Sequence, residues 1–145
     1  MYRGHTGLVP ETGDIIKAAS APGFSGCIKG MFITDPSIHE AIREKLDRRF
    51  GNGIAVVRSY PTFLEIMKAG VSKGEGLKTA MALRGLEAGE VLALGDEEND
   101  LSMFGAAGFS AAPANAGEKV KEAADLVIGA NSEDGVAAFI EKTFL

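Results

Sequence analysis

Four acidic side chains follow closely after a short apolar run in the second half of the chain. Residues 91–94 (VLAL) are apolar, and they are followed at once by Asp96, Glu97, Glu98 and Asp100. Two carboxylates 4 Å apart repel each other by about 1 kcal/mol in water and by about 4 kcal/mol at an effective dielectric constant of about 20. A bound cation would relieve this repulsion, and oxygen ligands without histidine or thiolate favour Mg²⁺.

Asp96 and Asp100 are the pair best placed to share such an ion. If a helix starts at Glu98 or Asn99, residues four apart bring their β-carbons to within about 5–6 Å. Mg²⁺ usually takes one or two carboxylates and completes its coordination with water and substrate phosphate. The alternative is that the acidic residues only cap a helix and interact with its dipole, each contributing about 0.3–1 kcal/mol. The acidic cluster by itself leaves both interpretations open.

A lysine in a glycine-rich segment upstream could complete a phosphate site. Lys73 lies between a predicted strand end and a predicted helix start, next to Gly74 and Gly76. Lysine offers a point positive charge to a phosphoryl group, and glycine lets the backbone approach a ligand closely. A solvated loop lysine is the plainer alternative. Together with the acidic cluster, however, Lys73 favours a site for phosphate and Mg²⁺.

The second half of the chain has a pattern typical of a parallel α/β sheet. We predict helices over residues 72–84, 101–106, 117–124 and 134–142, and strands over residues 91–94, 109–112 and 126–128. Strands that are apolar throughout are covered on both faces, as in sheets built from βαβ units. Ligands bind at the carboxyl ends of such strands. The acidic loop lies at one of these ends.

The first half has the pattern of a small α+β unit with an antiparallel sheet. Asp35 and Pro36 are typical of a helix start, and apolar residues recur every four positions from there to Phe50. We predict a helix over residues 36–50, a hairpin over residues 53–68 broken at Pro61-Thr62, and short strands within residues 24–34 and around Ile15-Ile16.

Composition limits the kinds of partner and site. The 145 residues are 46% hydrophobic, which is typical of about one globular domain, and the net charge of −5 includes no block of like charge. We therefore expect small molecules or proteins as partners, and no nucleic acid or membrane. The single cysteine, Cys27, excludes an intrachain disulfide. We expect Cys27 to be buried, His39 to lie on the polar face of its helix, and the protein to be cytoplasmic.

The run SKGEGL (residues 72–77) followed by GDEEND (residues 95–100) resembles the haloacid dehalogenase-like hydrolase superfamily. Residues 70–141 are most similar to its sugar-phosphatase (Cof-type) branch, which has a large inserted cap domain, and within it to the phosphoglycolate phosphatases of archaeal type. The resemblance implies an α/β fold. Residues 70–145 would be the C-terminal part of a Rossmann-like core, and residues 1–69 would be an α+β cap that determines substrate specificity.

The same resemblance implies roles for individual residues. Lys73 would contact the substrate phosphate and a reaction intermediate, and Asn99 would orient the phosphate. Asp96 and Asp100 would belong to the Mg²⁺ site, so that Lys73 and Asp96 are the catalytic candidates. Glu97 departs from the family pattern, which usually has serine or threonine there, and it adds a negative charge beside the metal site.

A larger departure concerns the nucleophile of the family. Family members begin with a strand carrying a DxDGT-like motif, whose first aspartate attacks phosphorus, and no DxD occurs in these 145 residues. That strand pairs, in the family, with the strand that is predicted here over residues 91–94. We therefore expect an open sheet edge that favours self-association or pairing with a complementing N-terminal chain.

Three functions are compatible with these observations. The first is the cap and C-terminal core of a Mg²⁺-dependent phosphomonoester hydrolase for a small phosphorylated metabolite, phosphoglycolate or a sugar phosphate. This chain alone would be inactive and would need an N-terminal segment. The second is a non-catalytic relative that binds a phosphorylated metabolite or a protein. The third is a structural domain whose acidic loop only caps a helix, and the presence of both Lys73 and the complete GDEEND motif disfavours it.

Overall fold

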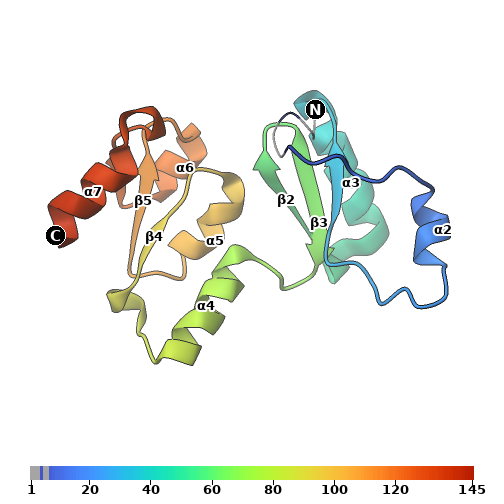
Figure 1. Cartoon of the computed structure of the whole chain (residues 1–145), viewed down its shortest axis with the longest axis horizontal. Helices are drawn as coiled ribbons and strands as arrows, with labels where there is room; N and C mark the ends of the chain where they lie inside the picture. Colours follow the sequence, from blue (N-terminus) through green and yellow to red (C-terminus); the bar gives the residue numbers. More distant parts are fainter. Residues whose placement is uncertain (1–3, 5–6) are drawn as a thin grey trace.

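The protein is built around two small β-sheets, one in each half of the chain (Figure 1). The structure is a computed structural model that describes residue 4 and residues 7–145. The first sheet contains β1 (Gly30–Ile33), β2 (Ile54–Tyr60) and β3 (Phe63–Lys68) in the order β1-β3-β2, and both pairings are antiparallel. Helix α3 (His39–Phe50) lies beside this sheet, between the 3-10 turns η1 (Pro36–Ile38) and η2 (Gly51–Gly53).

The secondary structure of the first half agrees with the prediction from its sequence, with one exception. The Asp35 side chain accepts a hydrogen bond from the backbone N–H of Ser37 at 2.8 Å and so caps the start of η1. The predicted helix, the hairpin and the strand within residues 24–34 are confirmed. The prediction of a strand around Ile15-Ile16 is wrong, because this segment forms helix α2 (Ile15–Ala19). The Asp14 side chain caps that helix, accepting from the N–H groups of residues 16 and 17, and this local bonding overrides the β-propensity of two isoleucines.

The second half forms a three-stranded parallel sheet in the order β4-β5-β6. Its strands are β4 (Leu92–Leu94), β5 (Phe109–Pro113) and β6 (Leu126–Ile128). The helices are α4 (Lys73–Arg84), α5 (Leu101–Phe104), α6 (Glu118–Ala123) and α7 (Gly135–Phe144), with 3-10 turns η3 (Ala88–Glu90), η4 (Glu98–Asp100) and η5 (Asn131–Glu133). The predicted fold class, part of a parallel α/β core plus an α+β unit with an antiparallel sheet, is confirmed. The division into residues 1–69 and 70–145 stays a prediction.

The main buried cluster fixes helices α5 and α6 against the parallel sheet. It consists of Ala93 on β4, Phe104 on α5, Ala112 on β5, Ala116, and Val120 on α6. The alanines on the strands are small, so the helices can approach the sheet closely enough to exclude water. This packing holds the loop between β4 and α5, which carries the acidic residues, in one position.

Strand β4 lies at an edge of the parallel sheet. Within residues 7–145, β4 pairs with β5 and with no other strand. An apolar pocket of about 500 Å³ lies nearby, with a lining that includes Leu92, Phe109, Leu126 and Phe139. The predicted open edge is therefore present among the residues that the structure describes.

Two single-residue predictions are wrong. His39 is buried, with 6% of its surface exposed, because it lies against the pocket that Arg43 and Arg58 also line, whereas residues 40 and 41 beside it on α3 are exposed. Cys27 is exposed, because it lies in an irregular segment before β1 that is exposed throughout, and its thiol donates to the Lys29 carbonyl oxygen at 2.9 Å.

None of the helices in the described part of the chain has the length and apolar content that a membrane span requires. The expected cytoplasmic location stays a prediction.

Candidate active site

The acidic loop turns directly over one of its own side chains at the carboxyl end of β4. Gly95 follows the strand, and a β-carbon at this position would lie 2.3 Å from the β-carbon of Asp100. Only glycine fits there without moving Asp100. The turn η4 then carries Glu98, Asn99 and Asp100, so that Asp100 lies under the loop.

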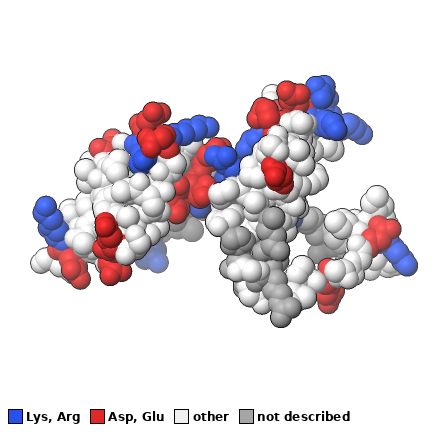
Figure 2. Space-filling model, turned by 90° about the horizontal axis from the view of Figure 1, so that it is seen from above, with Lys and Arg blue, Asp and Glu red and all other residues white. Residues whose placement is uncertain are grey.

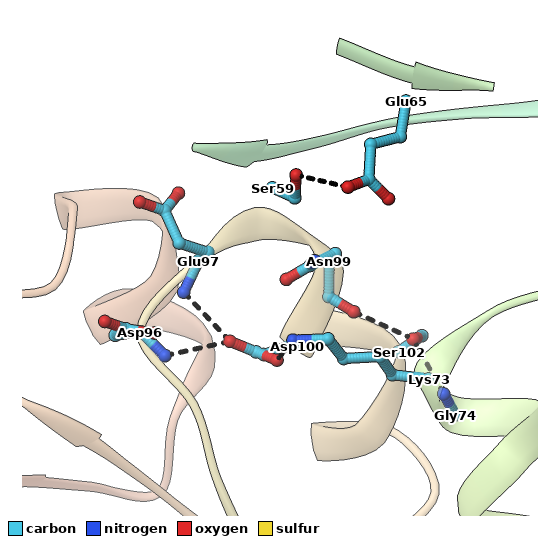
Figure 3. A network of polar contacts seen from close by, with 9 residues as sticks. All are labelled: Ser59, Glu65, Lys73, Gly74, Asp96, Glu97, Asn99, Asp100 and Ser102. Atoms are coloured by element: carbon cyan, nitrogen blue, oxygen red, sulfur yellow. Dashed lines mark hydrogen bonds and ion pairs between the residues drawn. The ribbon is translucent and has the colours of Figure 1, made fainter. Parts of the chain in front are cut away.

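Asp100 holds the loop and Lys73 together (Figure 3). Its side chain is nearly fully buried, with 4% exposed. Its Oδ2 accepts hydrogen bonds from the backbone N–H groups of Asp96 and Glu97, each at 3.0 Å, and its Oδ1 forms a direct ion pair with the Lys73 ammonium. A buried carboxylate is stable only when it is paired and hydrogen-bonded, and here both oxygen atoms have partners. The loop geometry and the position of Lys73 therefore depend on the same group.

Close packing of two helix starts brings Lys73 to Asp100. The backbone N–H of Gly74 donates to the Ser102 hydroxyl at 2.9 Å, and this hydroxyl donates to the Asn99 carbonyl oxygen at 3.3 Å. A β-carbon on Gly74 would lie 2.2 Å from the Ser102 carbonyl oxygen, whereas one on Gly76 would meet nothing within 4 Å. Gly74 is thus required for the close contact between α4 and α5. From the sequence, we had expected this glycine to let the backbone approach a ligand.

The carboxylates of the loop have different surroundings. Asp96 is exposed at the end of the strand. Burial raises the pKa of the Glu97 carboxyl, and the negative charges of Asp96, Asp100 and Glu98 raise it further, against the opposing charge of Arg58. The neighbouring carboxylates therefore add to the effect of burial on Glu97.

Glu98 is neutralised by residues that the sequence analysis did not single out. It forms a direct ion pair with Arg58 on β2, and Arg43 and Lys119 lie near its other carboxylate oxygen. Because these cations come from β2, α3 and α6, no spacing in the sequence relates them to the acidic loop. Arg43 and Arg58 join the first half of the chain to the second through Glu98.

A pocket of about 310 Å³ lies between the two halves, next to Lys73. Its lining includes Lys73, Asn99 and Ser102 from the second half and Val57, Glu65 and Met67 from strands β2 and β3. The Asn99 amide oxygen is buried and has no hydrogen-bond partner among the described residues. An unpaired buried polar atom costs about 1–3 kcal/mol, so Asn99 gains from a ligand that can pair with it.

Glu65 on β3 is a buried acidic residue that lines this pocket, and the sequence analysis missed it (Figure 3). Its Oε1 accepts hydrogen bonds from the Lys29 ammonium at 2.7 Å and from the Ser59 hydroxyl at 2.8 Å. Burial acts to raise the pKa of the Glu65 carboxyl, but these hydrogen bonds and the charges of Lys29 and Lys73 outweigh it and lower the pKa. Glu65 is therefore ionised at neutral pH and faces the pocket as a hydrogen-bond acceptor.

The residues around the loop can provide Mg²⁺ with one direct protein ligand. Among the described residues, no group of three or more His, Cys, Asp or Glu side chains could hold a metal ion. Asp96 is the exposed carboxylate, and it lines a pocket of about 170 Å³ at the carboxyl ends of β4 and β5. Both oxygen atoms of Asp100 are already engaged. Because Mg²⁺ commonly uses one or two carboxylates together with water and phosphate, this donor set fits the ion.

The four residues predicted to form the site, Lys73, Asp96, Asn99 and Asp100, lie together around this one loop (Figure 3). A profile of the family described as haloacid dehalogenase-like hydrolase matches residues 14–140, which is most of the chain. The chain belongs to the haloacid dehalogenase-like hydrolase family. The resemblance stated from SKGEGL and GDEEND is therefore confirmed.

Individual relatives agree with this assignment. A phosphoglycolate phosphatase of Methanosarcina acetivorans is 45% identical over 78 residues, covering 54% of this chain and 34% of the relative. An X-ray crystal structure of a Thermotoga maritima protein matches 99% of this chain and 53% of its own length, with 33% identity and a TM-score of 0.75. A crystallised sugar phosphatase of subclass IIB matches 79% of this chain and 42% of its own length, with 28% identity and a TM-score of 0.69.

These matches support the sugar-phosphatase branch that the sequence predicted. The chain spans between 34% and 43% of the length of the first curated relatives that it matches. The roles of Lys73, Asp96, Asn99 and Asp100 stay predictions.

Proposed function

We propose that these 145 residues are the cap and the C-terminal part of the core of a Mg²⁺-dependent phosphomonoester hydrolase. The observation that carries the proposal is the position of Lys73. Its ammonium is held by buried Asp100 at the carboxyl end of a parallel strand, next to a pocket enclosed by the other half of the chain. A fixed cation at such a strand end is suited to bind a phosphate group.

The reaction would proceed through a covalent intermediate. A carboxylate from residues outside this sequence would attack phosphorus and form an acyl phosphate, while the ester bond to the alcohol breaks and the alcohol leaves with a proton. Water would then hydrolyse the acyl phosphate and release inorganic phosphate. Lys73 would stabilise the negative charge that develops on the phosphoryl oxygens, and Asn99 would orient the phosphate.

Asp96 and Asp100 would contribute to the metal site in different ways. Asp96, exposed at the end of β4, would hold Mg²⁺ directly. Asp100 would support it by fixing the loop that carries Asp96 and by holding Lys73. When bound, Mg²⁺ neutralises charge on the phosphoryl group.

The pocket beside Lys73 suits a small phosphate ester with hydroxyl groups. Val57 and Met67 give it an apolar wall, and the ionised Glu65 supplies an acceptor for hydroxyl hydrogens. A leaving group with its own carboxylate, as in phosphoglycolate, would offer Glu65 no hydroxyl hydrogen, and the charge of Glu65 is already paired with Lys29. We therefore propose sugar phosphates as the preferred substrates within the two classes expected from the sequence.

The open edge of β4 would receive the segment that carries the nucleophile. Pairing there would place a new strand next to the loop of Asp96, and it would cover part of the apolar pocket around Leu92 and Phe109. The same edge could pair with a second copy of this chain, which would block the complementing segment. Sedimentation of the chain alone and of the mixture distinguishes the two arrangements.

Complementation tests the proposed function. The 145-residue chain would be mixed with a separately expressed N-terminal segment of a sugar-phosphatase relative, and hydrolysis of p-nitrophenyl phosphate would be followed with added Mg²⁺. We expect turnover in the mixture that Lys73→Ala abolishes and that Lys142→Ala, a lysine change on α7, leaves intact. A stable complex without turnover would contradict the proposal. It would favour the non-catalytic alternative, a phosphometabolite-binding relative.

A further inference from the structure

A second polar pocket, of about 380 Å³, lies where the two halves of the chain meet. It is lined by Pro36, His39, Glu40, Arg43 and Arg58 from the first half and by Glu98 and Lys119 from the second. Figure 2 shows Lys and Arg side chains next to Asp and Glu side chains at this junction. Of the residues given a catalytic, metal-binding or substrate-binding role above, none lines this pocket.

Three cationic side chains in this pocket face only two carboxylates, those of Glu98 and Glu40. Arg58 is paired directly with one oxygen of Glu98. Arg43 Nη2 and Lys119 Nζ lie 4.0 and 3.9 Å from the other oxygen of Glu98. A charge-assisted hydrogen bond is about 2.7–2.9 Å long, so these two cations are not fully used by Glu98.

Arg43 is already oriented for a ligand. Its Nη1 donates to the Val56 carbonyl oxygen at 2.8 Å, which fixes the guanidinium plane against β2 and leaves Nη2 toward the pocket. Lys119 lies opposite on α6, and its side chain is 70% exposed and free to move toward a bound group. An arginine fixed in this way loses little conformational entropy on binding an anion.

Other polar atoms around the pocket are poorly satisfied. Arg58 Nε and His39 Nε2 are buried and have no hydrogen-bond partner among the described residues. Small side-chain adjustments that accompany binding could pair them, which would offset the cost of leaving them unpaired. The pocket therefore combines positive charge that is not fully paired with buried nitrogen atoms that have no hydrogen-bond partner among the described residues.

We propose that this pocket binds a small oxyanion, a phosphate or carboxylate group, through Arg43, Arg58 and Lys119. The anion is separate from the phosphate proposed at Lys73. Because Arg43 and Arg58 belong to the first half and Lys119 to the second, the bound anion links the two halves directly.

The test is a titration of the isotope-labelled 145-residue chain with inorganic phosphate, without Mg²⁺, followed by NMR. We expect shifts of backbone amides around Arg43 and Lys119, and we expect these shifts to persist in Lys73→Ala. Lys119→Ala should weaken this binding by about fivefold or more, because hydrogen bonds to charged groups are stronger than neutral ones. Lys142→Ala removes the same charge at a position outside the pocket, and this variant should bind phosphate as tightly as the wild type does.

Equal dissociation constants for Lys119→Ala and Lys142→Ala would overturn the proposal. So would shifts confined to Gly74 and Ser102, because phosphate would then bind only next to Lys73. The matched control identifies nonspecific binding of phosphate to the protein surface, because such binding would be weakened equally by Lys119→Ala and Lys142→Ala. The readout needs neither turnover nor a complementing segment, so its failure leaves the phosphatase proposal untouched.

Discussion

Replacing Asp100 by alanine should strongly destabilise the protein. The change removes the acceptor of two backbone N–H groups, those of Asp96 and Glu97, and the partner of Lys73. A hydrogen bond to a charged group contributes about 1.5–3 kcal/mol. The Lys73 side chain is 47% exposed and can be rehydrated, so its ion pair adds only about 0–1 kcal/mol.

These contributions give an expected loss of about 3–7 kcal/mol in the free energy of unfolding for Asp100→Ala. That is a large share of the about 5–15 kcal/mol typical of a domain. Asp100→Asn keeps one oxygen that can accept both backbone hydrogen bonds, and it should lose only about 1–2 kcal/mol. A smaller loss in the free energy of unfolding for Asp100→Asn than for Asp100→Ala would show that Asp100 contributes more through its backbone hydrogen bonds than through its ion pair.

Urea unfolding followed by circular dichroism at pH 7 measures these differences. The control is Glu118→Ala, which removes an ion pair with Lys121 at an 82% exposed side chain and should change stability by less than about 0.5 kcal/mol. If Asp100→Ala is no less stable than this control, Asp100 does not anchor the loop. If Asp100→Asn is as unstable as Asp100→Ala, the backbone hydrogen bonds are not its main contribution.

Three further predictions concern packing, pH and specificity. Gly74→Ala should lower the melting temperature, because its β-carbon would lie 2.2 Å from a backbone oxygen of α5, whereas Gly76→Ala, with open space, should stabilise α4 by about 0.5–1 kcal/mol. Hydrogen bonds from Ser110 lower the pKa of the Asp125 carboxyl, so the unfolded state binds more protons and stability falls as the pH drops through the lowered pKa. The difference in urea midpoint between wild type and Asp125→Asn should thus be largest at pH 7 and shrink on acidification to about pH 2. In the complemented enzyme, Glu65→Gln should raise the ratio of phosphoglycolate to sugar-phosphate turnover.

Much of the secondary structure follows from local signals in the sequence. Asp35 caps the helical segment that was predicted after it. Ser72, which was predicted as the first helical residue, caps α4, and Gly85, with a φ of 66°, ends α4 in the left-handed conformation expected of a terminal glycine. Alternating strands and helices were enough to predict the parallel sheet and the place of the acidic loop at the end of β4. These features depend on residues close together in the chain.

The parts that the sequence did not predict depend on packing between distant segments. Arg58 and Glu98 are 40 residues apart, and no periodicity connects them. The burial of Glu65 likewise depends on the partners Lys29 and Ser59 and on how β3 faces the second half. His39 was misplaced because a residue at the start of a helix has no clear position on the apolar or the polar face.

The Mg²⁺ dependence of turnover in the complemented protein, measured with Asp96→Asn beside the wild type, shows whether the loop at the end of β4 is the active site. We expect that p-nitrophenyl phosphate hydrolysis stops when Mg²⁺ is chelated, returns when Mg²⁺ is restored, and is lost in Asp96→Asn although the complex still assembles. Hydrolysis that survives both chelation and Asp96→Asn would contradict this expectation, because the loop at the end of β4 would then not be the active site.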